Sequence, residues 1–331
     1  GGIINIVDQT IASKDFEGNN FNIGLERQTA NMGTSGSFSY KGNVNDVNLT
    51  YALKEVNFEN YHVPSGAIIH EGKPEAEESL ANSDLATFSH KFGTSVVRDW
   101  GYFGFSLGKI ENTYGIAFHG EEEEEHGEGE EEHEERIQVD SESENLTLEG
   151  AATNLRGLDK FNYFLQVNDY SFTESHVEGE HHGEEEEEEE EHGPTTFTNE
   201  SFEIGMKLDI GNQASGNRQN VTINVSQEDV AIISEEEVFM KPVDSQMLNF
   251  GYFICRELDV MDLDFGVRLD QVNRDGAIGN TLYDISESNL STALTMGWDV
   301  ANNIGLTLGI SSVARAPSEI ELFMNGTHLA A

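Results

Sequence analysis

The sequence is poor in cysteine, proline, basic residues and long apolar runs. Its 331 residues include five prolines, 18 lysines and arginines and a single cysteine, Cys255. One cysteine excludes an internal disulfide and a cysteine-rich zinc site. The few basic residues stand against 62 acidic ones, for a net charge of −44. Nucleic acid is therefore excluded as a partner, because phosphate binding needs clustered Lys and Arg.

Two further absences narrow the class of protein. No apolar run reaches the roughly 18–20 residues of a helical membrane span. Enzyme signatures are missing as well: His133-Glu134 lacks the second histidine of H-E-x-x-H, and no G-x-S-x-G occurs. We therefore expect no enzyme.

The sequence is rich in glutamate, concentrated in two histidine-bearing runs at 118–136 and 173–193. Together they hold 22 of the 62 acidic residues. They also hold seven of the 11 histidines, which are His119, His126, His133, His176, His181, His182 and His192. Removing these glutamates would still leave a net charge of −22.

Histidines set among carboxylates are ligands for a borderline divalent metal. Carboxylates alone favour calcium or magnesium, and added imidazoles shift the preference to zinc, with copper or nickel also possible. Glycines interrupt the first run, so it predicts a capture net that concentrates ions and not a preorganised site. The competing interpretation is a solvated, disordered loop whose glutamates repel one another.

Outside these runs apolar and polar residues alternate, as in Phe202-Ile204-Met206-Leu208 and Met261-Leu263-Phe265-Val267. This period of two predicts strands with one apolar and one polar face. A soluble sandwich and a transmembrane barrel both fit that pattern. Strands of about ten residues, charges along the polar face and aromatics near strand ends favour the antiparallel transmembrane β-barrel.

Connection lengths support the same choice. Short turns alternate with long polar segments, which we expect at 54–84, 111–143, 173–197, 226–245 and 271–288. Short turns on one rim and long loops on the other are typical of outer-membrane barrels. Both acidic runs fall in long loops and should project outside the cell.

Two segments carry a family resemblance. Arg315-Ala-Pro-Ser-Glu-Ile-Glu321-Leu-Phe323, followed by Asn325-Gly-Thr-His328, resembles the barrel signature of TonB-dependent outer-membrane receptors. The opening Gly1-Gly-Ile-Ile-Asn5-Ile-Val-Asp8 resembles the end of that family's plug domain. The acidic His/Glu loops are similar to those of its zinc-uptake branch.

The resemblance implies a domain plan. Residues 1–10 would end the plug, and 11–331 would form an incomplete barrel of about a dozen strands, whereas the family builds 22. Most of the plug, the energy-coupling box and a final aromatic strand are missing, so the chain looks like a fragment of a receptor. The resemblance also implies partners: outer-membrane lipid, a periplasmic TonB-type energy transducer and the metal ion.

A discrete metal site is expected from the same resemblance. His328 occupies the histidine position of N-G-x-H, and Glu237 the glutamate position of an E-x-F-x-x-P segment. Glu321 lies seven residues before His328 and could assist, although its position could be purely structural. His90, in a strand-like stretch, is expected to face the lumen.

The sequence therefore predicts a receptor in the outer membrane of a Gram-negative bacterium that captures and imports Zn²⁺. Two alternatives stay open: a TonB-dependent receptor for haem or another metal–chelator complex, and a soluble acidic β-protein that buffers metal.

Overall fold

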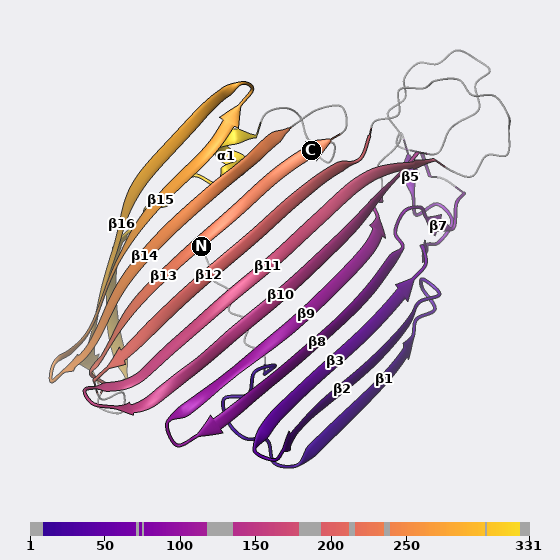
Figure 1. The fold of residues 1–331 in the computed structure, drawn as a ribbon. Helices are drawn as coiled ribbons and strands as arrows, with labels where there is room; N and C mark the ends of the chain where they lie inside the picture. Colours follow the sequence, from indigo (N-terminus) through magenta and orange to yellow (C-terminus); the bar gives the residue numbers. More distant parts are fainter. Residues whose placement is uncertain are drawn as a thin grey trace.

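The computed structural model describes residues 9–70, 73–74, 76–117, 135–178, 193–211, 216–234, 239–301 and 303–324. Thirteen strands form one antiparallel sheet in chain order (Figure 1). They are β1 (Asn19–Arg27), β2 (Thr34–Val44), β3 (Val47–Phe58), β8 (Leu85–Arg98), β9 (Gly101–Gly115), β10 (Glu135–Leu155), β11 (Leu158–Glu178), β12 (Thr195–Ile210), β13 (Arg218–Ser234), β14 (Met240–Leu258), β15 (Met261–Ile278), β16 (Thr281–Ala301) and β17 (Ile304–Ser312).

Two small hairpins and one short helix complete the described elements. The loop after β3 contains β4 (Tyr61–His62) paired with β7 (Ser79–Leu80), and β5 (Ile69–His70) paired with β6 (Lys73–Pro74). The helix α1 spans Glu319–Phe323. No helix in the described part of the chain has the length and apolar content needed to cross a membrane.

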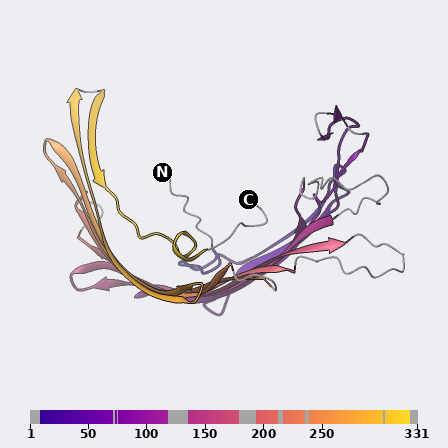
Figure 2. The ribbon, with the colours of Figure 1, turned by 90° about the horizontal axis from the view of Figure 1, so that it is seen from above.

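The sheet is curved into a trough, and α1 lies on its concave side (Figure 2). We call the side of the sheet that carries α1 the inner face. Because side chains alternate along each strand and register partners share a face, the pairing assigns every strand position to one face. Val230 packs near α1 and is therefore on the inner face. Register pairing leads from Val230, strand by strand, to Ser89 on β8 and then to Lys54 on β3, the seventh strand of the series. Ser89 and Lys54 are therefore also on the inner face.

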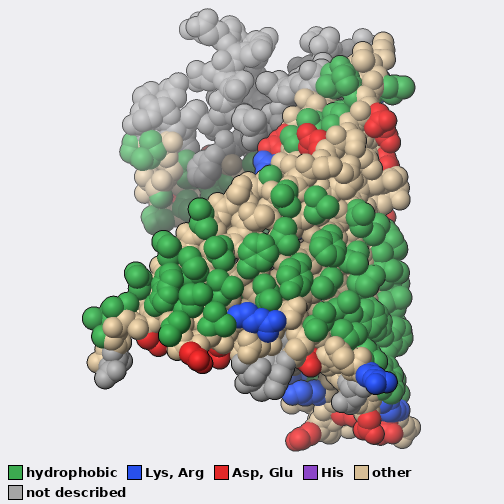
Figure 3. Space-filling view, turned by 90° about the vertical axis from the view of Figure 1, so that its left-hand side faces the viewer, with side chains coloured by type: hydrophobic (Ala, Val, Ile, Leu, Met, Phe, Trp, Pro, Cys, Tyr) green, Lys and Arg blue, Asp and Glu red, His purple; other side chains and the backbone are tan. Residues whose placement is uncertain are grey.

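The outer face carries an apolar belt. On β12 it comprises Phe202, Ile204 and Met206, which are 40–47% exposed, and Leu208 shares their face. Figure 3 shows hydrophobic side chains covering a broad area of one side of the molecule, with charged side chains toward its margins. Large apolar side chains thus face outward, while small and polar ones such as Ser, Thr and Asn predominate inward on β2 and β8.

The two rims differ as expected. At one rim, which we call the short-turn rim, most hairpins close in two residues, as at Asn45–Asp46, where both residues have positive φ (52° and 63°). This is the geometry of a type I′ turn. The longer segment 211–217 joins β12 to β13 at the same rim. The connections after β3, β9, β11 and β13 all leave from the opposite, long-loop rim.

Strand lengths correct the sequence analysis. Strands β10 to β16 have 16–21 residues, not about ten. Most of the predicted loops 226–245 and 271–288 is strand: β13 and β14 are separated by 235–239, and β15 turns into β16 at 279–280. The apolar part of each strand carries the period-two signal of a strand, whereas its polar continuation toward the long-loop rim has the composition of a loop.

A segment near the N-terminus lies across the inner face of β3 and β8. Thr50 Oγ1 donates to the carbonyl of Thr10 (2.6 Å), and Ser95 Oγ donates to that of Ala12 (2.6 Å). Asn48, which is 1% exposed, accepts from the Phe16 amide and donates to Asp15 and to Ser95. The plug assignment for 1–10 stays a prediction, since residues 1–8 lie outside the described residues.

Cys255 and His90 also receive a face from the register. Cys255 shares the inner face with Ser245 and pairs with Asp264. His90 lies on the outer face with Phe88, whose ring it contacts edge-on at 5.7 Å. The expectation that His90 faces the lumen was wrong, because the strand's alternation places Ser89 and Lys91 inward.

The hydrogen bonds of Asn48 generate the first prediction. Asn48→Ala should destabilise the protein by about 1–3 kcal/mol, because it removes several hydrogen bonds of a buried side chain and leaves the half-buried Phe16 amide without this acceptor. Urea unfolding in detergent measures this. Gln28→Ala, which removes one exposed side-chain bond to Glu26, is the matched control, and equal loss in both variants would contradict the assignment.

Candidate functional site

The two acidic runs begin from neighbouring positions on the long-loop rim. One run connects β9 to β10 and the other connects β11 to β12. Strands β10 and β11 are paired along their whole length, up to Glu135 opposite Glu178. The bases of both runs are therefore side by side, which the sequence alone did not establish.

Most histidines of the runs fall outside the described residues. They are His119, His126, His133, His181, His182 and His192. His176 lies within β11, where its backbone pairs with Ile137. Their role as ligands stays a prediction.

An acidic row crosses the outer face above the apolar belt. Each member is the register partner of the next on seven consecutive strands. The row consists of Glu144, Asp169, Glu200, Asp229, Asp244, Asp275 and Asp284. It continues on β9 as Lys109, which forms ion pairs with Glu142 (2.5 Å) and Glu144 (3.2 Å). The row lies toward the long-loop rim on every strand, so it marks a boundary between the belt and that rim.

The segment after β17 returns to the inner face and forms α1. Ser318 caps α1: its hydroxyl accepts from the Glu321 amide, and the Glu321 carboxylate accepts from the Ser318 amide. This reciprocal capping box fixes where the helix begins. Arg315 completes the arrangement with two hydrogen bonds of 2.7 Å to the Glu321 carboxylate.

A buried ion pair attaches α1 to the sheet. Arg274 on β15, with its side chain 5% exposed, donates to the Glu319 carboxylate at 2.7 Å, and Ser245 on β14 donates to the same oxygen at 2.6 Å. Burial alone would raise the pKa of Glu319, but the hydrogen bonds from Ser245 and Arg274 outweigh it, and the net shift of the pKa is downward. Glu319 therefore stays ionised in its buried position.

An apolar cluster beneath α1 joins two distant segments. Phe323, 1% exposed, packs with Val230, Ile232, Met240 and Val243. Phe239 and Met324 pack against the same cluster. Phe239 follows Glu237 by two residues, and Met324 precedes His328 by four.

The neighbours of the two strongest predicted ligands thus come together. Glu237 and His328 themselves lie outside the described residues, so their roles stay a prediction. The segments that lead to them converge above the inner face of β13–β15, near the long-loop rim. Resemblance alone had linked these positions, which are 91 residues apart.

Glu321 is described, and it is engaged in structure. Both of its oxygens accept from Arg315, and these bonds lower the pKa of the carboxyl to about 2. A metal would have to displace the guanidinium. Metal ligation by Glu321 stays a prediction, and the observed contacts favour its structural alternative. Within the described ranges, no three His, Cys, Asp or Glu side chains are grouped to hold a metal.

Comparison with known proteins addresses the fold. Two solved transporters share it: the FrpB iron transporter from Neisseria meningitidis (F3-3 variant), with a TM-score of 0.62 and 12% identity, and the copper transporter OprC, with a TM-score of 0.65 and 11% identity. The chain has the fold of these transporters. Together with the single antiparallel sheet, this confirms the predicted fold class, a partial antiparallel β-barrel.

The chain corresponds to only part of each transporter. The two matches cover 90% and 91% of this chain but 46% of each transporter, so the chain spans about half their length. No family model matches the sequence, and no curated protein does. That both neighbours are described as transporters agrees with the missing enzyme signatures.

The Arg274–Glu319 pair generates the second prediction. Glu319→Ala leaves Arg274 buried without its partner, which costs about 3–5 kcal/mol for a buried pair. Residues 313–324 should then lose protection from hydrogen exchange. The control is Glu287→Ala on β16, which removes a strand carboxylate outside this pair. Unchanged protection in Glu319→Ala would show that α1 is held by Phe323 alone.

The capping box generates a prediction about pH. Because the pKa of Glu321 is depressed in the folded protein, its contribution is fully present above the unfolded carboxyl pKa and is lost as pH falls toward 2. Hydrogen exchange of α1, corrected for intrinsic rates, should be the same at pH 7 and pH 5 and should increase below about pH 4. Loosening between pH 7 and pH 5 would contradict the assignment.

Proposed function

We propose that this chain is the sheet portion of a TonB-dependent outer-membrane receptor that captures and imports zinc. The observation that carries the proposal is that the described segments leading to the predicted ligands come together at one rim. Both Glu/His runs arise beside each other there, and the segments leading to Glu237 and His328 meet above the adjacent inner face. The fold shared with an iron and a copper transporter supports metal transport as the class.

The outer face supports a membrane location. The apolar positions of β12 run from Phe202 to Ile210, and those of β15 from Met261 to Leu269. Each run spans nine residues, the length that a tilted transmembrane strand needs. Above these runs the same faces become polar and reach the acidic row. The belt then contacts outer-membrane lipid, and the long-loop rim projects outside the cell.

Capture and transfer are separate stages in this proposal. The Glu/His runs concentrate Zn²⁺ by charge and by transient ligation, since a strongly negative surface raises the local concentration of cations. The ion then passes to a tighter site that includes His328 and Glu237. Inward release depends on a periplasmic TonB-type transducer, which the family resemblance supplies.

Copper and a chelated metal are the competing cargoes. Imidazole binds copper and nickel as well as zinc, and one structural neighbour is described as a copper transporter. A haem or chelate receptor would share the sheet without needing histidine in the runs.

Replacing the seven histidines of the runs by asparagine tests the capture stage. This variant keeps all glutamates, so it should bind fewer zinc ions at pH 7 in calorimetry and should slow zinc uptake by cells at low external zinc. The wild-type advantage should vanish near pH 5, because protons compete for imidazole, while α1 stays folded.

The matched control replaces seven glutamates of the same runs by glutamine, which changes charge and keeps the imidazoles. Zinc binding in the histidine variant that equals the wild type would refute ligation by histidine. If the histidine variant loses copper uptake and keeps zinc uptake, the cargo is copper and not zinc.

A further inference from the structure

The inner face over β1–β10 has a composition opposite to that of the chain as a whole. Three consecutive rungs of register partners cross the strands β1, β2, β3, β8, β9 and β10 there. Their 18 positions include no Asp or Glu and three lysines, Lys41, Lys54 and Lys91. The other positions carry Ser, Thr, Asn, Gly, Ala and one Ile. In a protein of net charge −44, this is a local reversal of charge.

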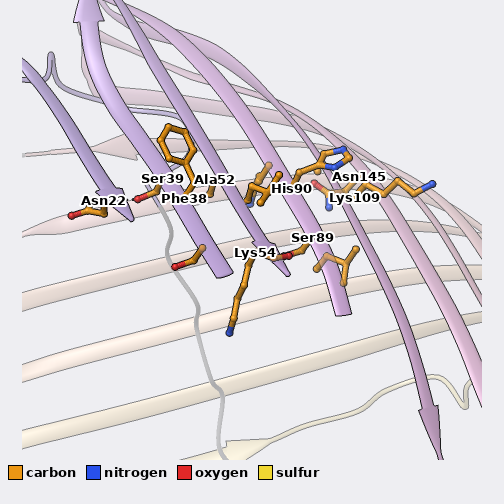
Figure 4. Close-up of a pocket in the computed structure, with 14 residues that line it drawn as sticks. Asn22, Phe38, Ser39, Ala52, Lys54, Ser89, His90, Lys109 and Asn145 are labelled. Carbon is orange, nitrogen blue, oxygen red and sulfur yellow. Dashed lines mark hydrogen bonds between the residues drawn. The ribbon is translucent and has the colours of Figure 1, made fainter. Parts of the chain in front are cut away.

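Two of these rungs, the one that contains Lys54 and Ser89 and the one that contains Ala52 and Lys91, line a hollow that we call the lysine basin. Its volume is about 350 Å³, and Figure 4 shows Lys54 extending from its strand with Ser89 nearby. The inner-face residues that line it include Ser37, Ala52, Lys54, Ser89, Lys91 and Gly108. Ala52 and Gly108 have small or no side chains, and this absence of bulk opens the hollow.

The two lysines are placed to act on one ligand. Lys54 is the register partner of Ser89, and Lys91 follows Ser89 by two positions on the same face. Side chains in this diagonal relation are about 7–8 Å apart at their bases, within reach of long side chains. Lys54 is exposed, so its ammonium is accessible from the trough.

The lining also includes apolar side chains such as Leu53 and Ile110, and beside them groups that can donate to oxygen acceptors. The hydroxyls of Ser37 and Ser89 and the amide of Asn145 can donate hydrogen bonds. Ammonium groups with hydroxyl and amide donors recognise carboxylate or phosphate oxygens. A bare metal cation finds no carboxylate among the described residues that line the basin.

We propose that the lysine basin is a binding site for a small oxyanion that carries several carboxylate or phosphate groups. The proposal goes beyond zinc import and does not depend on which metal is transported. Its chemistry matches a cargo that arrives as a metal–carboxylate complex of net negative charge. Capture at the acidic rim and binding in the basin would then select different parts of such a complex.

Calorimetric titration of the purified protein in detergent tests the proposal, with citrate and inorganic phosphate as separate probes. Lys54→Gln should weaken binding of the preferred probe about tenfold or more, as expected for loss of a charge-assisted hydrogen bond. Ala52→Phe fills the hollow without changing charge and should abolish binding. Ala52 is exposed, so this variant should keep the fold.

The control is Lys241→Gln, which makes the same change of charge on β14, where Lys241 donates to the carbonyl of Gly279. It should leave anion binding unchanged. Equal weakening in Lys54→Gln and Lys241→Gln would reduce the effect to overall charge and overturn the proposal, as would unchanged binding in both basin variants.

The two proposals can fail independently. Tighter binding of citrate than of phosphate identifies a polycarboxylate ligand, and the reverse identifies a phosphate. Citrate binding without any zinc requirement supports the basin even if zinc import is refuted. Zinc binding that is retained in Ala52→Phe shows that the basin is separate from metal capture.

Discussion

The alternation of side chains between two faces, kept in register over thirteen strands, is the constraint on which the structure depends. A shift of one residue between two strands would carry apolar side chains inward and polar ones outward on every later strand. Among the described strands, pairing is regular from β1 to β13, and irregularities occur only farther along, as between Val230 and Ile232. The acidic row and the lysine basin depend on this regularity, because it gives residues far apart in sequence a common height and a common face.

The same constraint separates opposite charges within a strongly acidic protein. Lys109 faces outward and is surrounded by Glu111, Glu142 and Glu144. Lys91 is one position beyond His90, the register partner of Lys109, and therefore faces inward. The outer face toward the long-loop rim is anionic, whereas the three inner rungs over β1–β10 carry lysines and no Asp or Glu. Net charge alone conceals this division, because 62 acidic residues outnumber 18 basic ones in the chain as a whole.

The strand class could be predicted from the sequence because a period of two is a local signal. Strand length could not, since the outer positions of β13 to β16 turn from apolar to polar above the belt, as from Val225 to Gln227 and Asp229. A stretch of alternating polar residues has the composition of a loop. The S-x-x-E spacing of Ser318 and Glu321 is a local signal for a helix cap. The Arg274–Glu319 contact has no such signal, and Arg274 lies in the segment 271–288, which the sequence predicts as a loop. Register, which joins Glu135 to Glu178 and aligns the acidic row, has no local signature at all.

The single cysteine has a consequence for how this fold can be probed. Cys255 faces the trough on β14, and the sequence holds no second thiol. A maleimide or a spin label would therefore attach at one defined place on the inner face without prior removal of other cysteines. The rate of its modification reports how freely a reagent of a given size enters the trough. Cys255 is therefore a natural labelling site for measuring access to the trough.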